Sequence, residues 1–126
     1  MKSIAEALDE ARALAAQRPW QLPNEATVIE AQRVLDLVSV EWPAPEVQAH
    51  ANGAITLEWE AGGDAGTHGW LTLTVVGQGT VEHAAVIDGD EYGLTEDFTD
   101  LLPGWANELL RRLHQAPELS PKRVLQ

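Results

Sequence analysis

The feature that most constrains the fold is a run of alternating apolar and polar residues between positions 46 and 87, interrupted by glycine-containing turns. Strict alternation places apolar side chains on one side of a β-strand and polar side chains on the other. Strands are expected at about 46–50, 54–60, 70–76 and 80–87. We predict a four-stranded antiparallel meander, because short turns join neighbouring strands antiparallel.

The turns set the register of this predicted sheet, since a slip of one residue would move every side chain to the wrong face. A two-residue turn at Asn52-Gly53 would place polar residues of the first strand on the face of Ile55, which is a poor match. A three-residue loop with Gly53 in the left-handed conformation avoids this, and the loop at 77–79 works in the same way. The predicted pairs are Val47 with Leu57, Ala49 with Ile55, Val75 with Val81, Leu73 with His83, and Leu71 with Ala85.

This register assigns each strand residue to an inner or an outer face. The inner, apolar face comprises Ile55, Leu57, Trp59, Leu71, Leu73, Val75, Val81, Ala85 and Ile87, with His83 among them. The outer face forms three rows: Glu60, Trp70 and Val86; Glu58, Thr72 and Ala84; Thr56, Thr74 and Glu82. The outer face is unusual because it carries no Lys or Arg.

Two helices are expected before the sheet. Ser3 with Glu6 is typical of a capping box, and apolar residues then recur at helical spacing, so the first helix is expected from about Ile4 to Arg18. Asn24 can cap a second helix, which Pro43 ends. The apolar positions of the second helix are Val28, Ala31, Leu35 and Val38, widened by Ile29, Val34 and Leu37. Such a wide stripe suggests burial on more than one side.

After the last predicted strand, residues 88–93 are typical of a turn-rich exit from the sheet. A final helix should follow, started by Thr95 and reset near Pro103. Its inward residues would be Phe98, Leu102, Trp105, Leu109 and Leu113. Residues 1–115 are therefore expected to form one α+β domain with all helices on one face of the sheet, and residues 116–126 a flexible tail.

The segment PEVQAHANGAITLEWEAGG, following two predicted helices, resembles a set of small bacterial proteins of unknown function. These share a Pro-x-Val segment, an (Asp/Asn)-Gly turn and a Leu-Glu-Trp strand. Asn52 stands where that pattern would have Asp, and the loop at 61–69 is long for it. The resemblance implies the same order of two helices and a meander, and it implies no activity.

Charge restricts the partners of the chain more than any motif does. Its 126 residues carry 20 acidic and 8 basic side chains, a formal net charge of -12, and fourteen of the acids but no Lys or Arg lie between residues 34 and 110. A negative field of this extent repels phosphate backbones and attracts cationic protein surfaces. We therefore expect a basic protein partner and no direct binding to nucleic acid.

Two further features bear on compartment. The absence of cysteine excludes disulfides and agrees with a reducing compartment. Charged residues interrupt any apolar run near the N-terminus, which argues against a signal peptide or a membrane span. A cytoplasmic protein without membrane contact is the expectation.

No chemical motif is complete. Asp88, Asp90 and Gly93 fit three positions of a calcium-binding EF-hand loop, but Tyr92 and Thr99 stand where oxygen ligands are needed, so no metal or cofactor is expected. The histidines lack metal-ligand spacing, and no serine lies in a nucleophile elbow. One catalytic alternative stays open: His83 faces inward and could act as a general base in a pocket, with Asp88 or Asp90 as its carboxylate partner.

Trp70 is the leading binding candidate, because it faces outward beside Val86 among carboxylates, as aromatic anchors of interfaces do. It could instead lie over its own sheet edge or beneath the loop at 61–69; Trp20, Trp42, Trp59 and Trp105 are expected to pack in the core or linkers. The predicted partner-binding residues are Trp70, Val86, Glu58, Glu60, Thr72, Glu82, Asp88, Asp90 and Glu91.

These residues predict a small acidic, non-enzymatic binding or inhibitor protein of the immunity, antitoxin-like or anti-defence type, which docks on a basic protein surface. A homodimer closed through the outer face is a further possibility. The alternative is a small enzyme or ligand-binding domain with a pocket near His83.

Overall fold

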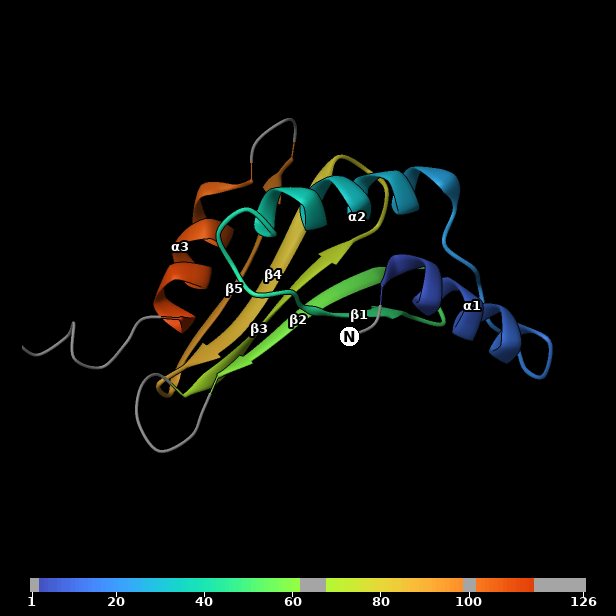
Figure 1. The fold of residues 1–126 in the computed structure, drawn as a ribbon, viewed down its shortest axis with the longest axis horizontal. Helices are drawn as coiled ribbons and strands as arrows, with labels where there is room; N and C mark the ends of the chain where they lie inside the picture. The colour runs from blue at the N-terminus through green and yellow to red at the C-terminus, as the bar shows by residue number, and fades with distance from the viewer. Residues whose placement is uncertain (1–2, 62–67, 99–101, 115–126) are drawn as a thin grey trace, which may run out of the picture.

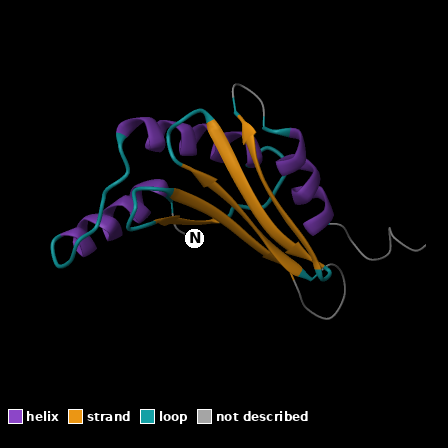
Figure 2. Ribbon diagram, turned by 180° about the vertical axis from the view of Figure 1, so that it is seen from behind, coloured by secondary structure: helices purple, strands orange, loops and turns teal. Residues whose placement is uncertain are grey.

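Three helices cover one face of a five-stranded antiparallel sheet (Figures 1 and 2). A computed structural model describes residues 3–61, 68–98 and 102–114. The helices are α1 (Ile4–Ala15), α2 (Glu25–Val38) and α3 (Gly104–Leu113). The strands are β1 (Glu46–Ala49), β2 (Ile55–Ala61), β3 (Gly69–Val75), β4 (Thr80–Ile87) and β5 (Asp90–Asp97), adjacent in chain order. The α+β class is confirmed, with one strand more than the sequence predicted.

The register of the first four strands is as predicted. Val47 pairs with Leu57, and Val75 pairs with Val81. Gly53 has a φ of 88°, the left-handed conformation that the three-residue loop requires. Strand boundaries differ from the predicted ones by no more than about one residue, the usual uncertainty of such limits.

The core lies between the inner face of the sheet and the helices. Every predicted inner-face residue is buried, including His83, which is 3% exposed. α1 packs on β1, α2 on β2 and β3, and α3 on β3 and β4. The largest fully buried side chains are Val34, Val38, Val47, Ile55, Leu57, Leu71, Leu73, Val75, Val81, Leu109, Leu110 and Leu113. Burial of these groups supplies the main driving force for folding.

Both N-terminal helices begin at their predicted caps. Ser3 and Glu6 form the capping box of α1. The helix ends at Ala15, three residues before the predicted Arg18. The N–H groups of Gln17 and Arg18 both bond the Leu14 carbonyl in a tight final turn, and the residue before a proline disfavours the α conformation.

The Asn24 side chain caps α2 by accepting a hydrogen bond from the Thr27 N–H at 2.8 Å. The expectation that α2 is buried on more than one side is wrong, since Ile29 is 54% exposed. Its buried stripe is Thr27, Ala31, Val34 and Val38.

The prediction that the chain leaves the sheet after β4 is wrong, because residues 90–97 form the fifth strand. Asp88 and Gly89 have φ angles of 50° and 89°, as the two central residues of a type I′ hairpin turn require. Thr95, predicted to start a helix, lies within β5, and Phe98 is buried at the end of this strand. α3 begins at Gly104, where Pro103 was expected to reset the helix.

Several predictions fall on residues outside the described ranges. They concern most of the loop at 61–69, Thr99 and the tail at 116–126. Within the described ranges, no helix combines the length and the apolar composition needed to cross a membrane.

Candidate functional site

No helix of the described residues covers the outer face of the sheet (Figure 1), and the side chains of this face form rows that run across the strands. One row is Glu60, Trp70, Val86 and Glu91; the next is Glu58, Thr72, Ala84 and Gly93; the third is Thr56, Thr74, Glu82 and Thr95. We call this surface the outer face. Its alternation with the buried inner face follows from the period of two along each strand.

Trp70 is the largest apolar side chain of the outer face and is 37% exposed. It lies opposite Glu60 on one side and Val86 on the other, and Glu91 continues the row on β5. This exposed fraction means that part of the Trp70 side chain is accessible to solvent. An aromatic side chain with carboxylates around it has the composition of an interface anchor.

The outer face is negatively charged throughout. Its carboxylates are Glu46, Glu58, Glu60, Glu82, Glu91 and Asp97. The Lys and Arg residues among the described ranges all lie on helices or just after α1: Arg12, Arg18, Arg33, Arg111 and Arg112. No described strand therefore offers a cation to neutralise this surface.

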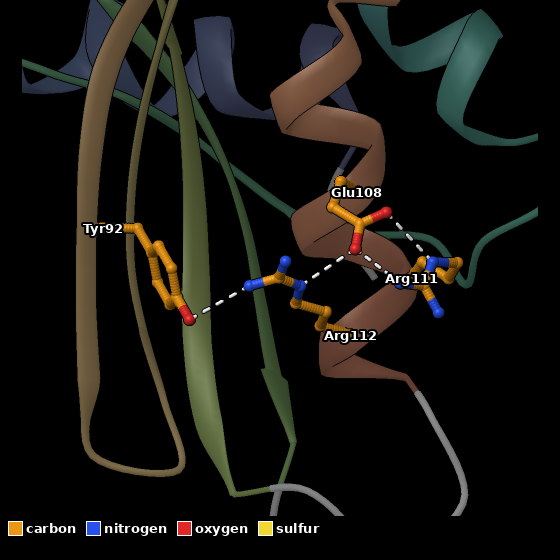
Figure 3. Close-up of polar contacts among 4 residues, drawn as sticks. All are labelled: Tyr92, Glu108, Arg111 and Arg112. Carbon is orange, nitrogen blue, oxygen red and sulfur yellow. Dashed lines mark hydrogen bonds and ion pairs between the residues drawn. The ribbon is translucent and has the colours of Figure 1, made fainter. Parts of the chain in front are cut away.

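The arginines of α3 are held by a carboxylate on the same helix (Figure 3). The Glu108 carboxylate accepts hydrogen bonds from Nε of Arg111 at 3.1 Å and from Nε of Arg112 at 2.9 Å. Arg112 also donates to the Tyr92 hydroxyl at 3.1 Å. The hydrogen bonds from the two guanidinium groups lower the pKa of Glu108 to about 2. The Glu108 carboxylate thus compensates one of these two positive charges locally, on the helix side of the molecule.

Seven of the nine predicted binding residues share the outer face: Trp70, Val86, Glu58, Glu60, Thr72, Glu82 and Glu91. The other two lie elsewhere. Asp88 is in the β4–β5 turn, where its carboxylate accepts the His68 N–H at 2.9 Å. Asp90 pairs with Ile87, so the register places it on the inner side of β5.

Apart from Glu91, sequence reasoning missed the contribution of β5 to this face. Gly93, Thr95 and Asp97 belong to it because they pair with outward residues of β4. The missed signal is the Asp88-Gly89 dipeptide after an alternating strand, which is a strong local indication of a hairpin.

The carboxylate beside buried His83 is Glu96, whereas the sequence suggested Asp88 or Asp90. Nδ1 of His83 lies 3.4 Å from Oε2 of Glu96 but makes no hydrogen bond to a described residue. The Glu96 carboxylate also accepts the backbone N–H groups of Trp105 and Ala106, each at 3.2 Å. Glu96 therefore caps the N-terminus of α3 from a neighbouring strand.

Two adjoining hollows lie between β5 and α3, and we call them together the β5–α3 groove. The first, of about 330 Å³, is lined by His83, Glu91, Tyr92, Gly93, Leu94 and Trp105. The second, of about 410 Å³, is lined by Glu96, Gly104, Trp105, Glu108 and Arg112. Trp105 borders both and is 47% exposed, so the prediction that it packs inward is wrong.

The other three tryptophans pack within the protein, as expected. Trp59 is buried, and its indole N–H donates to the Pro43 carbonyl at 2.8 Å. Trp42 stacks on His114 with ring centroids 5.5 Å apart. Trp20 is half-buried near β1. None of these three contributes to the outer face or to the β5–α3 groove.

Among the residues that the structure describes, no three His, Asp or Glu side chains are grouped so that they could hold a metal ion. The chain matches no protein-family model, no curated protein sequence and no solved structure. The resemblance to small bacterial proteins stays a prediction, and function must be argued from the two surfaces described above.

Proposed function

We propose that the protein is a small non-enzymatic binding protein that docks its outer face onto a basic surface of another protein. The observation that carries this proposal is the accessible indole of Trp70 within a face that has six carboxylates and no described cation. Aromatic anchors supply much of the affinity of protein interfaces, and surrounding charges select the partner. The partner must therefore present an apolar recess bordered by Lys or Arg.

An inhibitor role is the form of binding that best fits this charge. Proteins that act on nucleic acid expose basic surfaces to hold phosphates, and an acidic face can occupy such a surface. Immunity proteins, antitoxin-like inhibitors and anti-defence proteins act in this way. We expect the encounter to take place in the cytoplasm and to be fast at low ionic strength, since charge complementarity accelerates association.

The test is to capture the partner from the native cell, identify it by mass spectrometry and measure its affinity by calorimetry. Trp70→Ala should weaken binding by about thirtyfold, the effect of losing a hot spot of roughly 2 kcal/mol. Glu58→Lys with Glu82→Lys should weaken it further at low salt. The matched control is Asp36→Lys with Glu41→Lys, which changes net charge equally at exposed positions on and after α2.

Two results would contradict the proposal. Affinity that does not change with salt, or that falls equally in the control pair, would show that the charge of the outer face is not recognised. If the Trp70→Ala variant bound the partner with wild-type affinity, Trp70 would not be the anchor of the interface.

A second candidate function is supported by His83. This residue is 3% exposed, its Nδ1 has no hydrogen-bond partner among the described residues, and it lines the β5–α3 groove. A buried polar atom without a partner beside a hollow is a feature of ligand sites. If the protein binds a small molecule there, that molecule should raise the melting temperature of the wild type and have no effect on His83→Ala. Absence of any ligand-induced shift in a metabolite screen would exclude this candidate.

A further inference from the structure

We infer that β5 binds an extended segment of the basic partner as a sixth antiparallel or parallel strand, with apolar side chains of that segment entering the β5–α3 groove. The inference rests on the proposed function for the charge of the partner. It adds a second contact surface, on the edge and inner side of the sheet, to the outer face. The segment should alternate between basic and apolar residues.

The free edge of β5 follows from its hydrogen-bond pattern. Residues of an antiparallel pair alternate between those that bond the partner strand and those that point away from it. The Phe98 N–H bonds the Gly79 carbonyl at 2.8 Å, and the two-residue turn makes Ile87 and Asp90 a bonded pair. Both observations place the even-numbered residues of β5 against β4. The backbone groups of Glu91, Gly93, Thr95 and Asp97 therefore point outward from the sheet.

This edge differs from the opposite edge of the sheet. β1 has four residues and α1 packs on it, and the nearby Ala51 carbonyl already accepts the Gln21 N–H at 2.8 Å. β5 has eight residues, and no described residue pairs with its outer side. A long, unpaired edge strand is a template for an added strand.

The groove supplies the apolar part of the recognition. Leu94 and Trp105 line the same hollow and are 49% and 47% exposed, which is high for large apolar side chains. Side chains of an added strand would alternate between this groove and the outer face. Those on the groove side would lie next to Leu94 and within reach of the Trp105 indole.

Charge selects the occupant of this edge. The outward side chains of β5 include Glu91 and Asp97, beside Glu82 on β4, so residues of the added strand on that side should be Lys or Arg. A second copy of this chain fits poorly. In an antiparallel pairing of two copies through this edge, outward residues must face outward residues. Glu91 would then face Asp97 if the pair were centred on Leu94, and Asp90 would face Glu96 if it were centred on Gly93.

The probe is a synthetic peptide, acetyl-Lys-Val-Lys-Phe-Lys-Val-Lys-amide, compared with a peptide of the same composition in which the four Lys are consecutive. Amide hydrogen exchange of the full chain is followed by NMR. The alternating peptide should slow exchange at Gly93 and Thr95 by about tenfold or more, because their free N–H groups become bonded. The block peptide should not slow it.

Two variants test the edge directly. Thr95→Pro removes an outward N–H and leaves the bonds to β4 intact, so it should weaken binding of the alternating peptide about fivefold to tenfold. Thr95→Val keeps the N–H and should bind as the wild type does. If Thr95→Pro fails to fold, Trp105→Ala takes its place, since it removes one wall of the groove without altering β5.

The inference is overturned if the alternating peptide does not bind, if it binds without protecting the outward amides, or if Thr95→Pro (or Trp105→Ala in its place) binds it as tightly as the wild type does. These outcomes are separate from failure of the proposed function. Loss of partner binding in the outer-face variants with full binding in Thr95→Pro would leave the outer face as the only docking surface. Full partner binding in the outer-face variants with loss of binding in Thr95→Pro would leave the β5 edge as the only docking surface.

Discussion

At the scale of single residues, Glu96 has the most consequential position. It belongs to a strand, yet its carboxylate bonds two N–H groups at the start of α3 and lies beside buried His83. α3 has no side-chain cap of its own because Pro103 occupies the cap position. One carboxylate thus links β5, β4 and α3.

Glu96→Ala is expected to lower the free energy of unfolding by about 1–2 kcal/mol, since it removes a helix cap and leaves the N–H groups of Trp105 and Ala106 without an acceptor. Glu96→Gln should cost less, because its amide oxygen can still accept one bond. Urea unfolding followed by circular dichroism measures both. If the two substitutions lowered the free energy of unfolding equally, the negative charge of Glu96 would stabilise the protein and its hydrogen bonds to the helix terminus would not.

Glu108→Gln is expected to reduce stability near neutral pH and to have little effect in strong acid. Hydrogen bonds from Arg111 and Arg112 lower the pKa of Glu108 from 4.5 to about 2 in the folded chain. A carboxyl with a lowered folded pKa contributes stability that is present above its unfolded pKa and is lost as the pH falls through the folded value. Because the group is partly exposed to solvent, the effect should be small.

The measurement for Glu108 is the urea midpoint of wild type and variant across the range from about pH 7 to about pH 2. Glu41→Gln, an exposed carboxylate after α2, is the control. A difference between wild type and Glu108→Gln that is constant with pH would contradict the ion-pair explanation.

At the scale of elements, the β4–β5 hairpin is the main departure from expectation. β5 has acidic residues at four of its eight positions, and such residues have low intrinsic preference for strands. The Asp88-Gly89 turn nonetheless directs the chain back along β4, and Tyr92, Leu94 and Glu96 alternate on the inner side. Turn chemistry and pairing with a neighbouring strand therefore outweigh composition.

Two glycine substitutions with opposite expected signs test this account of the turn. Gly89→Ala should destabilise the protein by about 1–2 kcal/mol, because an L-residue resists a φ of 89°. Gly104→Ala at the start of α3 should stabilise it by about 0.4–1 kcal/mol through lower entropy of the unfolded chain. An added Cβ would meet no atom within 4 Å at either position, so packing does not enter the comparison. Destabilisation by both substitutions would contradict this explanation.

At the scale of the whole molecule, charge is divided between two sides. The described cations lie with the helices, and the outer face holds carboxylates that are close to one another. Glu46 and Glu58 lie directly opposite across β1 and β2, an arrangement that costs stability. A cost of this kind is expected where a surface serves binding.

Glu46→Lys is therefore expected to stabilise the protein by about 0.2–1 kcal/mol at low salt and to weaken binding to the basic partner. The gain should shrink in about 1 M salt, where screening acts over roughly 3 Å. Gln48→Lys, on the same strand opposite Thr56, is the control because it removes no acid-acid pair. Thermal melts at the two salt concentrations measure the gain, and a destabilised Glu46→Lys would contradict the expected repulsion.

The predictions that succeeded depend on short stretches of chain. The pairing of Val47 with Leu57, the outward position of Trp70 and the caps at Ser3 and Asn24 are decided by residues close in sequence. The acidic composition of residues 90–97 concealed their alternation, so β5 was missed. The exposure of Trp105 could not be inferred either, because its neighbours on the groove side belong to β5.

Alternation, turn residues and charge counts thus specified four strands, their register and an anionic outer face, since each of these depends on local geometry or on simple sums over the chain. The tertiary structure alone decided that β5 completes the sheet, that Glu96 caps α3 beside His83, and that Leu94 and Trp105 line the same groove. The physical reason is that such contacts join residues far apart in sequence, and they form only when the helices pack on the sheet in one particular arrangement.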